Sequence, residues 1–409
     1  MGGCCGGPRP PPSGGDPCRQ AAPACSAAPT APALSPRFAG MVANALAHVR
    51  ERKAAGDPIV GILCEYTPRE VIMAAGGVPV CLCGGSNDTI PAAEQHLPAN
   101  LCPLIKSTYG YHIEGSNPFL ELCDLVVAET TCDGKKKMYE LMAETRPMHV
   151  LQLPQRIDGP GRELWLGELR RLCTVLAQRC GRTVDDAGLR RAIAVMERER
   201  SLRRDLAGLM ACADPPLSGR QLLELKSLAS GIPEDLDEYA RLLAELPGRP
   251  AVLPGAVRVL LTGVPVPHGA EKVVDLIEMH GGVVVAQENC TGLKPLSLRI
   301  DPAAADPLTA IADAYLHLPC SVMTPNDGRL ELLREHAARF RPDCVVELVW
   351  QACLTYDVES QWVKRLAGEL GLPYLRIGTD YASGDAARIA VRLEALFETA
   401  RGRARPCDG

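Results

Sequence analysis

Short apolar runs alternate with helix-like stretches twice along this chain, and this alternation limits the possible folds more than any other feature. In the first half the runs lie at 58–63, 78–82, 122–128 and 148–153. In the second half they lie at 256–262, 283–286, 342–350 and 374–377, and a last helix is expected at 386–401. Strands separated by helices predict parallel sheets with right-handed crossovers. We therefore expect an α/β fold with two parallel sheets.

The two halves have the pattern of a degenerate internal repeat. Each contains a strand, a loop, a helix, a Gly-Gly pair and a second strand, and each then has a cysteine beside a proline, at Cys102 and Cys320. We predict two Rossmann- or flavodoxin-like lobes, at 37–160 and 251–409. Between them, 161–250 is rich in Leu, Ala, Arg and Glu at spacings of three and four, which predicts a helical segment.

Local motifs set further expectations about the ends of elements. Residues 1–36 are rich in Gly, Pro, Ala and Ser and lack the basic start and apolar run of a secretory signal, so we expect a disordered tail. The sequence Thr67-Pro68-Arg69-Glu70 has the pattern of a capping box with Pro at the first helical position. A helix is therefore expected to begin there.

Charge and cysteine content restrict the class of function. The net charge is −5, so no basic surface for nucleic acid is expected, and no apolar run reaches the roughly 18 residues of a membrane span. The chain has 18 cysteines and no export signal. In a reducing compartment such thiols bind metals, act in catalysis or fill the core. We expect a cytoplasmic protein that binds neither membranes nor nucleic acid.

Several cysteines follow predicted strands, where open α/β sheets place their sites. A set of three is expected in each lobe: Cys64, Cys102 and Cys132 in the first, and Cys290, Cys320 and Cys353 in the second. Within the repeat, however, Cys83 is the counterpart of Cys290, so Cys64 and Cys83 are competing candidates. The spacings exceed those of a zinc knuckle and suit ligands from separate loops. Iron–sulfur binding, zinc binding and inert buried thiols all remain open at this point.

The residues after Cys132 favour an anionic ligand. Lys135, Lys136 and Lys137 stand at the start of a predicted helix, where the helix dipole disfavours cations. A thiolate-bound group nearby would offset that cost, whereas a solvated lysine run is the structural alternative.

Long motifs in both halves resemble a known family. The segments CEYTPREVIMAAGGVPVCLCGGS, NLCPLIKS and AETTCDGKKKMYE resemble the first lobe of the 2-hydroxyacyl-CoA dehydratase and benzoyl-CoA reductase family. The segments ENCTGLKP, LPCSVMTPND and QACLTYDVES resemble its double-cubane cluster proteins. The resemblance covers about 59–400.

The resemblance implies a cofactor and its ligands. It implies a double-cubane cluster, two [4Fe–4S] units joined by a sulfide, held by Cys64, Cys102, Cys132, Cys290, Cys320 and Cys353. The family's C-x-Y-x-P-x-E motif favours Cys64 over Cys83. Val322 stands where other members have a further cysteine, so that position is no ligand here.

The resemblance also implies partners and a reaction. The partners are an ATP-hydrolysing [4Fe–4S] activator, a second copy in a homodimer and a small-molecule substrate. The chain has no P-loop, so ATP would be hydrolysed elsewhere. We predict an oxygen-sensitive iron–sulfur reductase of low potential, with Glu129 and His268 as candidate proton donors. The alternatives are a 2-hydroxyacyl-CoA dehydratase subunit, which removes water by radical chemistry, and a non-catalytic iron–sulfur carrier.

Overall fold

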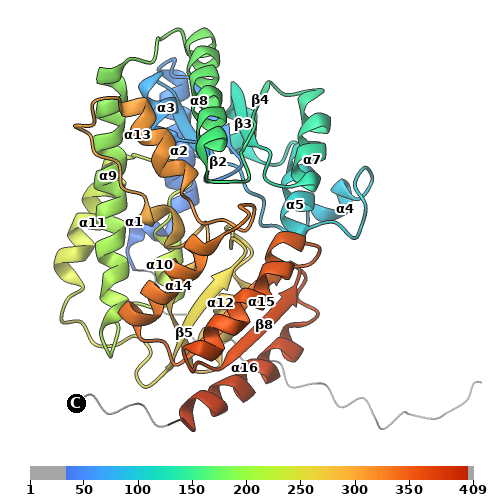
Figure 1. The fold of residues 1–409 in the computed structure, drawn as a ribbon, viewed down its shortest axis with the longest axis vertical. Coiled ribbons are helices and arrows are strands. Elements are labelled where there is room, and N and C mark those ends of the chain that lie inside the picture. Colours follow the sequence, from blue (N-terminus) through green and yellow to red (C-terminus); the bar gives the residue numbers. More distant parts are fainter. Residues whose placement is uncertain (1–33, 404–409) are drawn as a thin grey trace, which may run out of the picture. The chain divides into compact units, whose positions relative to one another are not determined.

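Two separate four-stranded parallel sheets organise the chain (Figure 1). The computed structural model describes residues 34–403. The first sheet, in the order β2-β1-β3-β4, consists of β1 (Ile59–Ile62), β2 (Val78–Cys81), β3 (Leu125–Glu129) and β4 (Met148–Leu151). The second sheet, in the order β6-β5-β7-β8, consists of β5 (Val257–Gly263), β6 (Gly282–Glu288), β7 (Cys344–Trp350) and β8 (Tyr374–Thr379). The shared order confirms the predicted α/β class with two parallel-sheet lobes.

Strand burial explains the continuous apolar runs in the sequence. Every residue of β1, β3, β5, β6 and β7 is buried, as expected where helices cover both faces of a parallel sheet. The edge strands β4 and β8 are partly exposed. In both sheets the chain leaves the first strand towards one edge and returns on its other side. The loops after β1 and β3, and after β5 and β7, therefore flank a switch point, where such sheets bind ligands.

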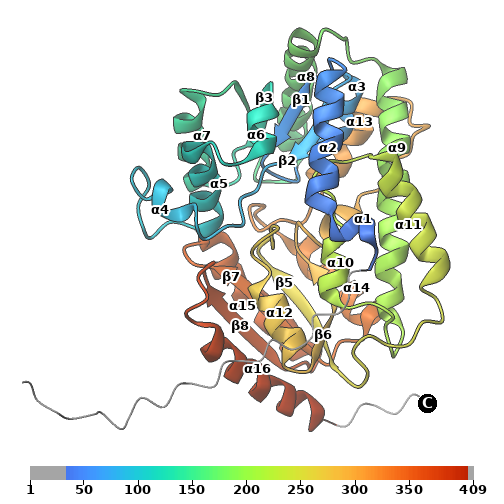
Figure 2. The ribbon, with the colours of Figure 1, turned by 180° about the vertical axis from the view of Figure 1, so that it is seen from behind.

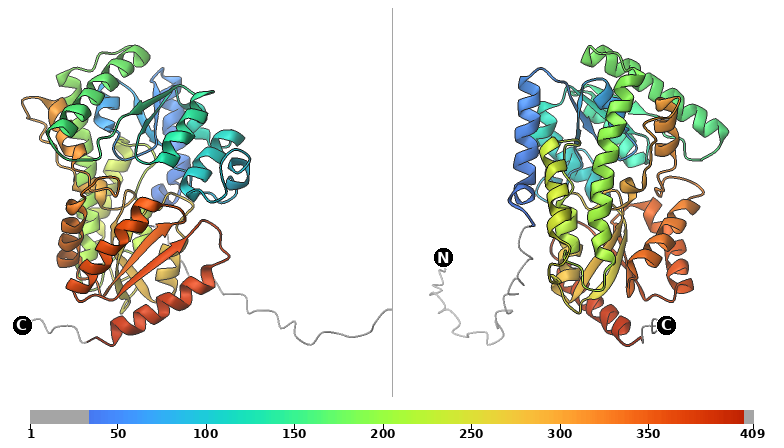
Figure 3. Two further views of the ribbon diagram at one scale, coloured as in Figure 1. Left: turned by 45° about the vertical axis from the view of Figure 1, so that its right-hand side comes forward. Right: turned by 90° about the vertical axis from the view of Figure 1, so that its left-hand side faces the viewer.

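Each lobe also contains helices before, between or after its strands. The first lobe has α1 (Pro36–Ala39), α2 (Met41–Ala54), α3 (Arg69–Ala74), α4 (Ile90–Ala93), α5 (Pro103–Glu114), α6 (Pro118–Leu122) and α7 (Asp133–Ala143). The second has α12 (Lys272–Met279), the 3₁₀ turn η2 (Lys294–Ser297), α13 (Pro307–Leu316), α14 (Asp327–Phe340), α15 (Leu354–Glu369) and α16 (Ala386–Arg401). Figure 3 shows α16 lying along the second sheet, whose strands β5, β7 and β8 it contacts.

The segment between the lobes is helical. It consists of α8 (Gly159–Cys180), α9 (Asp186–Gly208), η1 (Leu209–Ala211), α10 (Gly219–Glu224) and α11 (Pro233–Glu245). Helix α9 packs against α3 of the first lobe and η2 of the second, and it runs beside both lobes (Figure 2). An isolated bridge joins Val80 to Ala229 at the edge of the first sheet. The predicted domain boundaries remain predictions.

One segment of the second half packs on the first lobe. Ile300, Ile311 and Tyr315 share an apolar core with Val60 of β1 and Trp165 of α8. The Tyr66 hydroxyl donates to the Leu318 carbonyl at 2.7 Å, and the Tyr315 hydroxyl donates to Glu70 Oε2 at 2.8 Å. This crossing brings the loop that carries Cys320 to the end of the first sheet.

Two local predictions need correction. The predicted capping box is wrong: α3 begins at Arg69, its N-cap is Pro68, and no side chain caps it. The Thr67 hydroxyl donates to the buried Glu129 carboxyl. Nearly all of the predicted tail, 1–36, lies outside the described residues. Its last residues belong to the fold, since Ser35 caps α1 by accepting from the Phe38 N–H at 3.2 Å.

Candidate functional site

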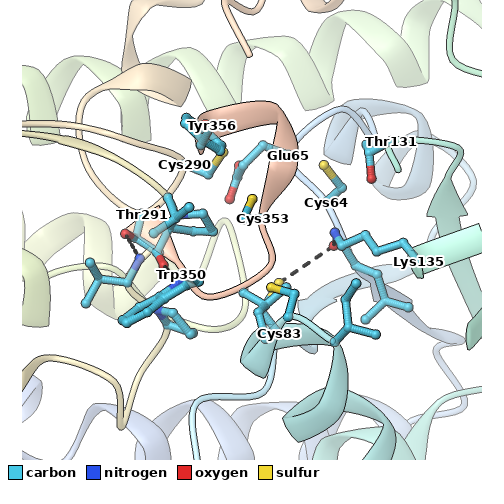
Figure 4. A pocket seen from close by; sticks show the side chains of 18 of the residues that line it. Cys64, Glu65, Cys83, Thr131, Lys135, Cys290, Thr291, Trp350, Cys353 and Tyr356 are labelled. Atoms are coloured by element: carbon cyan, nitrogen blue, oxygen red, sulfur yellow. Dashed lines mark hydrogen bonds between the residues drawn. The ribbon is translucent and has the colours of Figure 1, made fainter. Parts of the chain in front are cut away.

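Cysteines from both lobes line one cavity of about 520 Å³. It lies at the carboxyl ends of the strands, and Figure 4 shows several of its side chains. Eight cysteines contribute to its wall: Cys64, Cys81, Cys83, Cys102, Cys132, Cys290, Cys320 and Cys353. The structure therefore brings all six predicted ligands together. Cys83, the competing candidate, lines the same cavity and donates to the Leu63 carbonyl at 3.7 Å.

Strand ends and helix starts place these thiols. Cys64 comes two residues after β1 and Cys290 two residues after β6. Cys132 and Cys353 each come three residues after the neighbouring central strand and form the N-caps of α7 and α15. Cys102 is the N-cap of α5, where Pro103 takes the first helical position.

Burial keeps several of these thiols protonated in their present surroundings. It raises the pKa of Cys64 and Cys353 to about 12, and it also raises the pKa of Cys102. Backbone N–H groups of the first helical turn face Cys102 and Cys353 and oppose that rise. Bound metal ions would deprotonate these buried thiols, because cysteine binds metals as the thiolate.

Thiols from different lobes are neighbours around the cavity. Cys290 and Cys320 are hydrogen-bonded to each other, which lowers the pKa of Cys320 and raises that of Cys290. Their electrostatic neighbour is Cys64 of the first lobe. Cys353 interacts in the same way with Cys102 and Cys132. Among residues 34–403, no three ligand side chains converge tightly enough to hold a single metal ion. The thiols surround a volume and so suit a group larger than one ion.

Lys135 forms no salt bridge with a carboxylate in the described part of the chain. Its ammonium donates to the Leu63 carbonyl at 2.8 Å and points towards the thiols (Figure 4). The acidic groups around it are the Tyr139 phenol, the thiols of Cys64, Cys83 and Cys132, and the Glu129 carboxyl, whose pKa burial raises to about 8. Lys226, by contrast, pairs with Glu65 Oε1 at 2.6 Å. The unneutralised charge of Lys135 favours a negatively charged occupant of the cavity.

A buried network supports the second-lobe wall. Tyr356 lines the cavity, with its hydroxyl 4.0 Å from Cys320 Sγ and 3.0 Å from Lys294 Nζ. Lys294 pairs with Glu288 at 2.9 Å. The Arg329 guanidinium stacks on the Tyr356 ring at 4.8 Å. It also reaches carboxylate oxygens of Glu288 at 3.1 Å, Glu347 at 3.2 Å and Glu359 at 2.6 Å.

The two predicted proton donors occupy different positions. His268 lines the cavity and is half-exposed, with Nδ1 3.3 Å from Glu271 Oε1. Glu129 does not line the cavity; it lies at the end of β3, behind the lining residue Thr131. Burial raises the pKa of Glu129 to about 8, and the hydrogen bond from Thr67 opposes that rise only in part. Glu129 Oε2 and the Thr131 hydroxyl are buried without a partner.

The lobes touch beside the cavity through glycines. A Cβ on Gly85 would lie 2.1 Å from the His268 carbonyl oxygen, and Gly269 has a φ of +97°. The Tyr381 hydroxyl of the second lobe donates to the Gly84 carbonyl at 3.1 Å. This close backbone contact depends on the absence of side chains.

Sequence reasoning missed Lys226, Lys294 and Tyr356. Two of them carry a signal in hindsight: Lys294 follows Cys290 by four residues and Tyr356 follows Cys353 by three, as Lys135 follows Cys132 by three. A spacing of three or four brings a side chain back to the same face of a helical turn. Lys226 has no such spacing, because it reaches the cavity from the helical segment.

Most of the chain matches the model of one protein family. Residues 64–400 match the family described as 2-hydroxyglutaryl-CoA dehydratase, D-component. The chain belongs to this family. The match begins at Cys64, the first cavity cysteine.

Named relatives agree with this membership. YjiM of Escherichia coli (strain K12), which carries the provisional name of a dehydratase subunit, is 40% identical over 90% of this chain and 98% of its own length. The beta subunit of (R)-phenyllactyl-CoA dehydratase of Clostridium sporogenes is 21% identical over 88% of this chain and 97% of its own. A benzoyl-CoA reductase subunit of Thauera aromatica is 24% identical over 67% of this chain and 72% of its own. Within residues 34–403 no helix is both long and apolar enough to span a bilayer.

Proposed function

We propose that this chain is an iron–sulfur subunit of a dehydratase-type enzyme that acts on 2-hydroxyacyl thioesters of coenzyme A. The observation that carries the proposal is the set of six thiols, three from each lobe, around one cavity. Relatives named as subunits of 2-hydroxyacyl-CoA dehydratases support the reaction class.

The cavity residues fit an iron–sulfur group on three grounds. Soft thiol ligands select such clusters, zinc or copper(I). The thiols surround a volume, and they do not converge on the point that one zinc or copper ion requires. The unpaired ammonium of Lys135 favours a negatively charged group. The residues that would hold it are Cys64, Cys102, Cys132, Cys290, Cys320 and Cys353.

The chain's own residues would control charge and solvent. A bound iron–sulfur group supplies one-electron reduction at low potential. Lys135 and Lys294 place positive charge on opposite lobes beside the sulfurs. The Tyr356 hydroxyl lies near Cys320 Sγ and is suited to donate to it. His268 is the lining side chain best placed to hand a proton to a ligand in the cavity, since its ring is exposed to it and paired with Glu271.

A second candidate function is low-potential reduction of a small substrate on a double-cubane cluster. It rests on the same six-thiol cavity as the first proposal, since both sets of three thiols lie on a single chain. In either case the electrons would come from an ATP-hydrolysing [4Fe–4S] activator. A relative named as part of a benzoyl-CoA reductase is in keeping with a reductive reaction in this family.

The first experiment measures iron and sulfide in protein purified without oxygen, together with its absorption spectrum. About eight irons per chain support the double cubane and about four a single cluster. Iron-free protein, or protein with one or two zinc ions, refutes the proposal. Cys64→Ser and Cys83→Ser separate the competing ligands, because only the true ligand lowers the iron content. Cys173→Ser on α8 is the matched control, since Cys173 does not line the cavity.

The second experiment separates the two reactions. The iron-loaded protein is incubated with a purified activator, ATP and either a 2-hydroxyacyl-CoA or a small reducible compound. Loss of water from the thioester without net consumption of electrons identifies the dehydratase. Stoichiometric electron consumption with the small compound identifies the reductase. ATP use that depends on neither substrate would leave a carrier and refute both enzymatic proposals.

A further inference from the structure

Helix α15 exposes three large apolar side chains along one face. Leu354 is 72% exposed, Val358 73% and Trp362 54%. Their spacing of four places them one above the other on the helix, so they form a continuous apolar strip. The Arg365 guanidinium lies 4.7 Å from the Trp362 ring and borders the strip. We call Leu354, Val358 and Trp362 the α15 patch.

The α15 patch begins at the cavity. Cys353 is the N-cap of α15, and Leu354 both lines the cavity and faces solvent. On the first lobe, Asp133 at the start of α7 also lines the cavity, and its side chain is 95% exposed. The cavity therefore opens between the starts of α7 and α15. A protein seated on the α15 patch would lie beside this opening, next to Cys353.

The size and composition of the α15 patch indicate what kind of partner covers it. A stable pair of copies buries about 800 Å² per partner, with roughly 20–30 residues on each side. Three apolar residues are too few for an interface of that size, and the same helix face continues with polar Arg365 and Glu369. Short-lived redox encounters have smaller interfaces. Trp and Arg are residue types that often dominate binding energy at such contacts.

We propose that the α15 patch is the docking surface for a protein electron donor. This inference rests on the proposed function, because the donor must have an iron–sulfur group in the cavity to reduce. In the step it serves, a reduced donor loses one electron and the group in the cavity gains it, while no bond forms or breaks. The position of the patch at the opening shortens the path between donor and thiols.

The test compares charged substitutions on two exposed faces. Val358→Glu and Trp362→Glu place a carboxylate in the α15 patch at positions that do not line the cavity. Val391→Glu on α16 is the matched control, since Val391 is 65% exposed and far along the chain from the site. Surface changes of this kind have little effect on folding. Each iron-loaded protein is mixed in a stopped-flow instrument with a purified ATP-hydrolysing [4Fe–4S] activator of a family dehydratase, and separately with titanium(III) citrate.

The expected result is a difference between the two reductants. Val358→Glu and Trp362→Glu should slow reduction by the activator about tenfold or more, while titanium(III) citrate reduces all four proteins at equal rates. The Val391→Glu control should match the wild type with both. Equal rates with the activator in all proteins, or no reduction of the wild type by it, overturn the docking surface. So does a change from dimer to monomer on light scattering in Val358→Glu, since a second copy then covers the patch. Absence of iron–sulfur absorption in the wild type overturns the proposed function itself.

Discussion

Lys294 offers a direct test of how the buried network acts on the cavity. Its ammonium is buried and pairs with Glu288, and its electrostatic neighbours include Cys290 and Cys320. Lys294→Met removes this positive charge and keeps most of the side-chain volume. An electron added to a group held by these sulfurs loses an attractive charge in the variant. We therefore expect a more negative reduction potential.

The structure sets the scale of this shift. The Lys294 ammonium is 3.0 Å from the Tyr356 hydroxyl, which is 4.0 Å from Cys320 Sγ, so nitrogen and sulfur are at most about 7 Å apart. At an effective dielectric constant of about 20, a unit charge at that distance interacts by about 2.4 kcal/mol. For one electron this corresponds to about 100 mV. Spread of the electron over the group and proton uptake by Glu288 reduce the value, so a fall of about 30–100 mV is expected.

The assay is a redox titration of the iron-loaded protein followed by absorbance and electron paramagnetic resonance. Lys53→Met is the matched control, because Lys53 pairs with Asp124 and does not line the cavity. Its potential should stay at the wild-type value. Tyr356→Phe keeps the cation and removes the hydroxyl near Cys320, so it separates hydrogen bonding from charge. An unchanged or more positive potential in Lys294→Met would refute the electrostatic argument.

Three further predictions concern stability. Arg329→Leu leaves three carboxylates without their shared cation and should cost about 3–5 kcal/mol in denaturant unfolding; a loss below about 1 kcal/mol would contradict the network. Because burial raises the folded-state pKa of Glu129 to about 8, wild-type stability should fall by up to about 1.4 kcal/mol per unit as pH rises from about 4.5 to about 8. Glu129→Gln should remove this slope. If the stabilities of the variant and the wild type fall in parallel with pH, the raised pKa of Glu129 is not the cause. Gly85→Ala forces a Cβ against the His268 carbonyl and should lower the free energy of unfolding by about 1–3 kcal/mol. Gly159→Ala, with open space around it, is the control and should be neutral. Equal melting temperatures of the two variants would refute the tight contact at Gly85.

The sheets could be predicted because their signal is local. Buried parallel strands are continuous apolar runs, and all eight appear in the sequence close to their observed bounds. The last helix, α16, has the predicted limits of Ala386–Arg401. The capping box at Thr67 failed because the N-cap falls one residue later, at Pro68, and the Thr67 hydroxyl donates to Glu129, 62 residues further along the chain. A single sequence does not reveal such a competitor.

The candidate site was predictable where sheet geometry places its residues, and not where contacts between distant segments do. Cys64, Cys132, Cys290 and Cys353 follow strands within two or three residues, so sheet geometry alone gathers them at one edge. Cys320 follows no strand, and its place depends on the crossing of residues 300–318 to the first lobe. Lys226 likewise reaches Glu65 and the Cys290 carbonyl across 161 and 64 residues. These contacts are set by packing of distant segments, which residue patterns do not encode.

The crossing also explains why two lobes on one chain form one cavity. If thiols were in contact only within their own lobe, a small gap between the lobes would divide the six thiols into two separate sets. Here Cys320 is tied to the first lobe, because Tyr66 holds the Leu318 carbonyl two residues before it. Cys64 precedes Tyr66 by two residues, so a single hydrogen bond joins the loops of both thiols. Lys226 adds a second link between Glu65 and the Cys290 carbonyl. The distances between thiols of different lobes are therefore fixed by direct contacts next to the sulfurs, and a group that needs ligands from both lobes would find them already in place.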